Sequence, residues 1–212
     1  MPIQEMREVR KRGRSVTRTI RLDEDITLQL AATAERERQS GNIIIAKALR
    51  RYLEWTQYAK LLNHATVSHT LLEKMMDYLT AEEARELGRW SATNTLVEMT
   101  NMLFGGVRLT STIATLAIMA KYSGRFALEH TFENSKHYLI LIHDAGLKWS
   151  QFYEEFLITG IQNSQVKQFD VKITDNQVAV FIEEPGLASG IATETTLRDR
   201  TSDRSHSEED RS

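Results

Sequence analysis

The stretch TRTIRLDEDI, Thr17 to Ile26, decides how the first part of the chain folds. From position 16 to position 22 the even positions are apolar apart from Arg18, and the odd positions are polar. The apolar residues are Val16, Ile20 and Leu22, and the polar ones are Thr17, Thr19 and Arg21. Alternation with period two on β-favouring residues predicts a strand with one buried and one exposed face.

Two helices are predicted directly after this strand. Asp23 is a candidate N-cap, and apolar residues recur at helical spacing from Ile26 to about position 38. The sequence QSGN then breaks the helix, and Asn42 is expected to cap the next one. Its apolar side comprises Ile44, Ile45, Ala48, Leu49, Tyr52 and Leu53. The strand has no partner nearby in sequence, so a second copy of the chain is expected to supply one.

This order of strand, helix, turn and helix resembles the ribbon-helix-helix family of DNA-binding proteins, which includes the Arc-like and MetJ-like repressors. The resemblance rests on TRTIRLDEDI and on SGNIIIAKALRRYLEW, residues 40–55, and covers residues 14–56. It implies a homodimer whose two-stranded ribbon enters the major groove of double-stranded DNA. The implied base contacts are Thr17, Thr19 and Arg21, because Arg can bond guanine and Thr can bond or pack against base edges. Asn42 and Ile43 would grip phosphate at the start of the second helix.

Basic residues precede the strand, although the whole chain has a formal net charge of -2. Such an arm at one end of a near-neutral chain points to a polyanion, most often nucleic acid, although a solvated tail is the alternative. The expected phosphate contacts are Arg10, Lys11, Arg12 and Arg14. A protein-interaction or scaffold role, antitoxin-like and without DNA, is the alternative function.

The rest of the chain predicts a second domain over residues 57–184. Helical patterns end at Gly105–Gly106 and at Gly124, and a capping box of Thr80 and Glu83 opens one of them. FALEHTF (residues 126–132), HYLILIH (137–143), FDVKI (169–173) and VAVFI (178–182) read as strands around one more helix. We therefore predict an α+β fold with an antiparallel sheet, preceded by a basic arm at 1–14 and followed by a disordered tail at 185–212.

This second domain resembles ligand-sensing α+β domains, such as the vinyl-reductase-like and haem nitric-oxide-binding superfamily, and domains that follow DNA-binding segments in archaeal proteins. The segment that carries the resemblance is LIHDAGLKWSQFYEEF, residues 141–156. His143, Trp149, Phe152 and Tyr153 are the candidate lining of an effector pocket, although the helical spacing of the three aromatic residues favours a core. A sensor domain and an assembly domain both remain open.

The sequence predicts no enzyme, no cofactor and no metal site, because no phosphate-binding glycine loop or nucleophile motif is present. His130, His137 and His143 with Asp144 are the residues from which a metal or acid–base site could still be built. The chain of 212 residues has no cysteine, no apolar run of membrane-spanning length and no signal peptide. We expect a cytoplasmic protein with no membrane partner.

Overall fold

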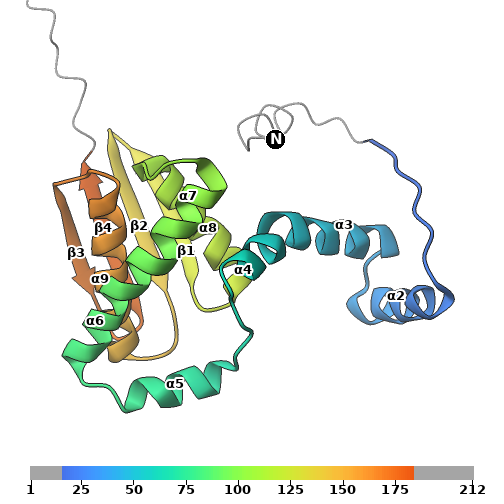
Figure 1. The fold of residues 1–212 in the computed structure, drawn as a ribbon, viewed down its shortest axis with the longest axis horizontal. Helices are drawn as coiled ribbons and strands as arrows, with labels where there is room; N and C mark the ends of the chain where they lie inside the picture. The colour runs from blue at the N-terminus through green and yellow to red at the C-terminus, as the bar shows by residue number, and fades with distance from the viewer. Residues whose placement is uncertain (1–15, 184–212) are drawn as a thin grey trace, which may run out of the picture.

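The computed structural model describes residues 16–183 and shows two parts, an N-terminal helical unit and a larger body (Figure 1). The predicted basic arm and tail lie outside these residues. The N-terminal unit consists of α2 (Glu24–Glu37), α3 (Gly41–Arg51), the π-helical segment η1 (Tyr52–Thr56) and α4 (Gln57–Leu61). Residues 16–22 before it are exposed and form no strand in the described chain, so the strand predicted there is not observed.

The body begins with helices and ends with a sheet, in line with the predicted α+β class. Its helical elements are α5 (His69–Asp77), α6 (Ala81–Ser91), the π-helical segment η2 (Ala92–Val97), α7 (Glu98–Phe104) and α8 (Leu109–Ser123). Strands β1 (Ala127–Glu133) and β2 (Lys136–Ile142) follow, then α9 (Leu147–Asn163), β3 (Phe169–Ile173) and β4 (Gln177–Glu183). The predicted limits of β3 coincide with the observed ones.

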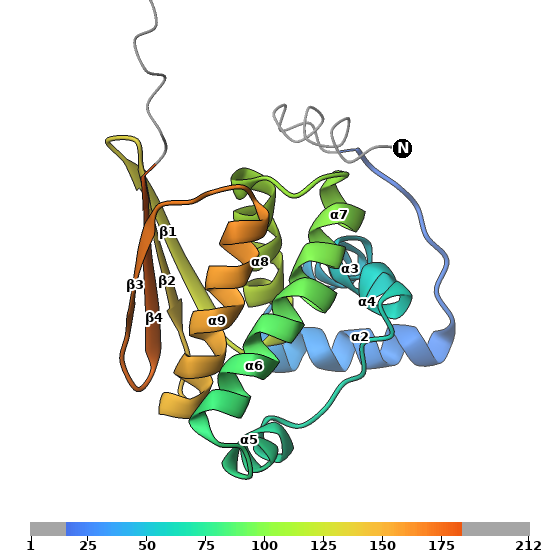
Figure 2. The same ribbon diagram turned by 60° about the vertical axis from the view of Figure 1, so that its left-hand side comes forward.

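The four strands form one antiparallel sheet in the order β1-β2-β4-β3. Leu139 and Leu141 of β2 and Val178 and Val180 of β4 point to the helices and are fully buried. Figure 2 shows the described helices on that face of the sheet and none on the opposite face. The core therefore lies between the central strands and helices α8 and α9.

Helix α9 packs on α6 and on η2 at two glycines. A Cβ atom on Gly88 of α6 would lie 2.2 Å from the carbonyl oxygen of Phe152 in α9, and one on Gly160 of α9 would lie 2.5 Å from Cδ2 of Leu96 in η2. Helix α9 can approach α6 and η2 this closely only because neither position carries a side chain.

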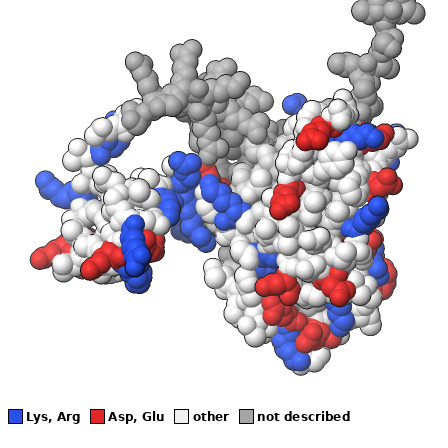
Figure 3. Space-filling model, turned by 180° about the vertical axis from the view of Figure 1, so that it is seen from behind, with Lys and Arg blue, Asp and Glu red and all other residues white. Residues whose placement is uncertain are grey.

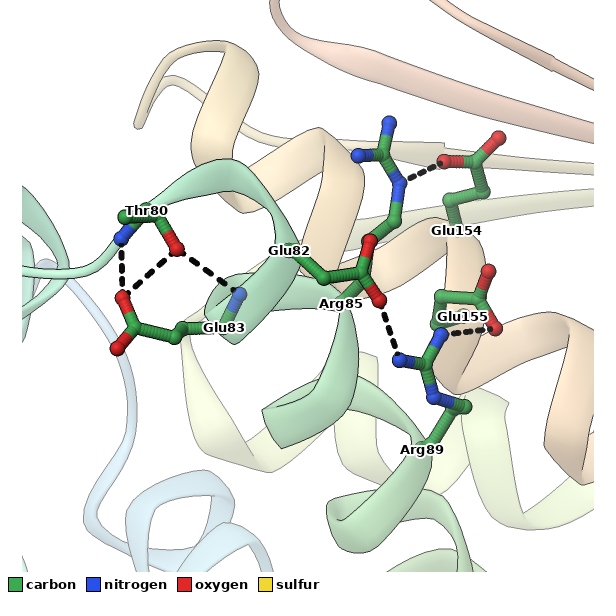
Figure 4. Close-up of polar contacts among 7 residues, drawn as sticks. All are labelled: Thr80, Glu82, Glu83, Arg85, Arg89, Glu154 and Glu155. Atoms are coloured by element: carbon green, nitrogen blue, oxygen red, sulfur yellow. Dashed lines mark hydrogen bonds and ion pairs between the residues drawn. The ribbon is translucent and has the colours of Figure 1, made fainter.

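Polar contacts at the surface reinforce this helix pair (Figure 4). Arg85 pairs with Glu154 at 3.3 Å, and Arg89 bridges Glu82 at 2.7 Å and Glu155 at 3.3 Å. The predicted capping box is confirmed at the start of α6, where Thr80 and Glu83 exchange hydrogen bonds. Those bonds from Thr80 lower the pKa of the Glu83 carboxyl.

The start of α3 differs from the prediction. Ser40, not Asn42, is the N-cap of α3, and its hydroxyl accepts from the N–H of Ile43 at 3.3 Å. Both residues are good caps, and here Ser40 lies three residues before that N–H.

Among residues 16–183 no single helix has the length and apolar composition needed to cross a membrane. One pair of helical stretches, Ala81–Phe104 and Leu109–Ser123, reaches that length and composition together, and it is bent by 107°.

Candidate functional site

The N-terminal unit leaves its apolar side uncovered. No residue of α2, α3, η1 or α4 is buried. Leu49 is 55% exposed and Leu53 is 50% exposed, on the side of α3 and η1 that the sequence predicts to be buried. Within the unit, Leu30 of α2 packs beside Gly41 at the start of α3. An uncovered apolar side of this kind is typical of a surface to which another segment or molecule binds.

The segment before α2 has the same property. Val16 is 71% exposed, Ile20 is 50% exposed, and the predicted base-contact residues Thr17, Thr19 and Arg21 are also exposed. In Figures 1 and 2 the segment leads into α2 and lies away from the sheet. The described chain covers neither face of residues 16–22. Their pairing with the same residues of a second copy therefore stays a prediction.

The predicted phosphate contacts fall in two places. Arg10, Lys11, Arg12 and Arg14 lie outside the described residues, whereas Asn42 and Ile43 form the exposed first turn of α3. The N–H of Ile43 already donates to the Ser40 hydroxyl, so a phosphate there would share or displace that cap. Figure 3 shows Lys and Arg gathered where the N-terminal unit meets the body, and mixed with Asp and Glu on the rest of the unit.

A polar and aromatic junction joins the N-terminal unit to the body, and sequence reasoning missed it. Glu54 of η1 accepts hydrogen bonds from Nζ of Lys121 at 2.8 Å and from the hydroxyl of Tyr122 at 2.7 Å. The Trp55 and Tyr122 rings stack with centroids 6.2 Å apart, and the Arg51 guanidinium lies 5.9 Å from the Tyr122 ring centroid. The partners are 67 and 68 residues apart in sequence, so no local pattern predicts them.

The body contains the predicted pocket residues, and they pack against one another. The Tyr153 ring lies 5.7 Å from Trp149, 5.1 Å from Phe152 and 5.3 Å from His143. Burial raises the pKa of Tyr153 to about 12. The Arg125 guanidinium, which the sequence did not single out, covers the Trp149 ring at 4.2 Å. Trp149 and Tyr153 belong to the hydrophobic core, Phe152 packs against it, and His143 is buried beside Tyr153.

His143 is held by two hydrogen bonds. Its Nδ1 accepts from the N–H of Ala145 at 3.2 Å, so the neutral ring carries its proton on Nε2 and donates to the Ser150 hydroxyl at 2.9 Å. Burial lowers the pKa of His143, which favours this neutral form. The two bonds engage both ring nitrogens and fix the orientation of the His143 ring.

The other histidines do not join His143. Nε2 of His130 lies 2.9 Å from Nδ1 of His137 across β1 and β2, so these two form a pair. Asp144 instead borders an open depression with Gly146, Thr174, Asp175 and Asn176. Among residues 16–183 no group of three potential ligands could hold a metal ion. The four-residue site of His130, His137, His143 and Asp144 is therefore not assembled.

No family model, no curated protein and no solved structure matches this chain. Its function is therefore inferred from its own geometry.

Proposed function

We propose that this chain is a sequence-specific DNA-binding transcription regulator that acts as a homodimer. In this proposal residues 16–22 of two copies pair as an antiparallel ribbon, and α2 and α3 of both copies share one core. The exposed apolar side of the N-terminal unit carries the proposal, because a second copy of the same unit would bury Ile20, Leu49 and Leu53. The polar face of the ribbon then remains outside, with Thr17, Thr19 and Arg21 available for base edges.

The proposed dimer also assigns base contacts and phosphate contacts to different segments of the chain. Arg21 and the threonines lie on the segment proposed to enter the major groove, and the basic residues at positions 10–14 precede it in the sequence. Phosphate contacts position a protein on DNA, whereas base contacts specify the sequence.

The body would then position the two N-terminal units or respond to a small molecule. The packing of His143, Trp149, Phe152 and Tyr153 against one another favours assembly over sensing.

Selection of bound duplexes from a random pool, followed by binding at several salt concentrations, tests the proposal. Arg21→Ala should weaken the selected site by about 1–3 kcal/mol and random DNA much less. Neutralising Arg10, Lys11, Arg12 and Arg14 should weaken all sequences alike and reduce the salt slope by about one unit for each lost phosphate contact.

Lys167→Ala, an exposed lysine of the body, is the matched control and should leave DNA binding unchanged. Absence of any salt-dependent DNA binding would contradict the proposal and would favour the antitoxin-like scaffold role. Thermal shifts across a metabolite screen would separate a sensor from an assembly domain, because a bound effector raises the melting temperature.

A further inference from the structure

The outer face of the sheet has an apolar centre. Its central residues are Tyr138, Ile140 and Ile142 of β2 and Ala179 and Phe181 of β4. These strands are therefore apolar on both faces, although the described helices cover only one of them (Figure 2). A sheet that faces water usually alternates apolar and polar residues, and apolar residues on both faces are typical of strands covered on both sides.

The edge strands give this face a charged rim. Glu129 of β1, Ile140, Ala179 and Lys172 of β3 form one row across the four strands. Thr131, Tyr138, Phe181 and Asp170 form the next row. An apolar centre within a polar rim is the usual anatomy of a protein–protein interface.

The opposite charges at the two ends of the row from Glu129 to Lys172 favour a second copy of this chain as the partner. Glu129 lies at one edge and Lys172 at the other, about 14 Å apart at the usual strand spacing, so they cannot pair within one chain. A twofold axis parallel to the strands, between β2 and β4, would place β1 of one copy over β3 of the other. Glu129 would then face Lys172 of the second copy at both edges, and Ile140 would face Ala179.

Two copies could also stack about a twofold axis that runs perpendicular to the strands, but this arrangement is less favourable. It would place β1 over β1 and bring the acidic edge formed by Glu129 and Glu133 against itself. Like charges facing each other destabilise such a contact. Stacked sheets cross at about 30°, and the long Glu129 and Lys172 side chains can span the resulting offset.

We propose that the outer face of the sheet is a self-association surface on which a second copy of this chain stacks, with its β3 over β1. This contact is distinct from the proposed N-terminal dimer and does not depend on DNA. The sheet measures roughly 15 Å by 20 Å, or about 300 Å² on each copy, which is less than a stable specific interface buries. The contact is therefore weak alone and is strengthened when the N-terminal units already hold two copies together.

Site-directed cross-linking of the full chain tests this geometry, because the sequence contains no cysteine. Two variants, Glu129→Cys and Lys172→Cys, are each treated with a short bis-maleimide alone and as a mixture. The mixture should give linked dimers, and each variant alone should give few, because identical positions lie at opposite edges of the stack. Lys74→Cys on α5, mixed with Lys172→Cys, is the control for chance encounters and should give few links.

The apolar centre provides a second arm of the experiment. Introducing Ile140→Lys or Ala179→Glu into both cysteine variants should reduce the linked fraction at least tenfold, while an unchanged melting transition shows that the body is folded. Equal linking in all combinations, or none in the mixture, would overturn the proposal. Cysteines at 129 and 172 that neither link nor react with a small thiol reagent would mean that another segment of the chain covers this face, which also overturns it.

Discussion

The N-terminal unit and the body differ in how far they bury their apolar side chains. Leu96, Leu116 and Leu157 of the body are at most 1% exposed, whereas α2, α3 and α4 contain no buried residue at all. The body therefore encloses a core within one chain, and the N-terminal unit has apolar residues but no core. In the proposed homodimer, a second copy of the chain supplies the core that the N-terminal unit lacks.

The largest expected effect is the loss of stability when a core residue of the body is truncated, and it can be compared with a truncation in the N-terminal unit. The side chain of Phe156 in α9 is buried in the core and only 2% exposed. Phe156→Ala should therefore lower the free energy of unfolding of the body by about 3–5 kcal/mol. The loss should not depend on protein concentration. Leu49→Ala in α3 should instead lower the melting temperature of the N-terminal unit in a concentration-dependent way, because its proposed partner is another chain.

Denaturant titration at two protein concentrations, followed by far-UV circular dichroism, measures both effects. A loss below about 1 kcal/mol for Phe156→Ala would contradict the assignment of the core. Concentration-independent melting of the N-terminal unit would contradict the proposed dimer.

Alkaline pH should weaken the body through Tyr153. Its pKa is raised to about 12 by burial, whereas an unfolded tyrosine has its usual pKa of about 10. Between these values the unfolded chain has lost the proton and the folded chain has kept it, so stability falls as pH rises. The full loss is about 2–3 kcal/mol above pH 12 and is absent below pH 10.

Tyr153→Phe separates this effect from general alkaline unfolding. The variant should lose less stability than the parent between pH 10 and pH 12, as measured by urea unfolding at each pH. Equal losses in the two proteins would show that the Tyr153 hydroxyl does not titrate as an isolated buried group.

Gly88 and Gly160, where α9 packs on α6 and on η2, provide a matched pair of substitutions. Gly88→Ala should destabilise the body by about 1–3 kcal/mol, because its methyl group would meet the rigid backbone carbonyl of Phe152. Gly160→Ala should cost less, because it meets the end of the flexible Leu96 side chain. Thermal melting compares the two variants, and the reverse order would mean that the helix backbone yields more readily than Leu96.

The smallest expected effect concerns the junction between the two parts. Tyr122→Phe removes the hydrogen bond to Glu54 but keeps the ring against Trp55, so we expect a cost of about 0.5–1.5 kcal/mol. Hydrogen exchange should quicken in residues 52–61 while the protection of β2 and β4 stays unchanged. Tyr78→Phe, at a tyrosine that is 78% exposed, is the control.

Much of the body could be predicted from the sequence because its signals are local. The capping box of Thr80 and Glu83, the helix end at Gly105 and the strand Phe169–Ile173 each depend on residues a few positions apart. The sheet order and the junction between Glu54 and Tyr122 could not be predicted, because they join distant segments. The start of α3 was misplaced because Ser40 and Asn42 are both capable caps in one short turn.

The π-helical segment Tyr52–Thr56 is the place in the N-terminal unit where the chain can lose one residue with little change of direction. It interrupts one continuous helix that runs from Gly41 to Leu61. Each residue of an α-helix advances the chain by about 100° and 1.5 Å, and a π-turn holds one residue more than an α-turn. Deleting one residue from this segment would convert the π-turn into an α-turn and leave the direction of everything before it nearly unchanged. The same deletion within α3 would instead rotate α2 and the segment that carries Arg21 by about 100° about the helix axis relative to the sheet.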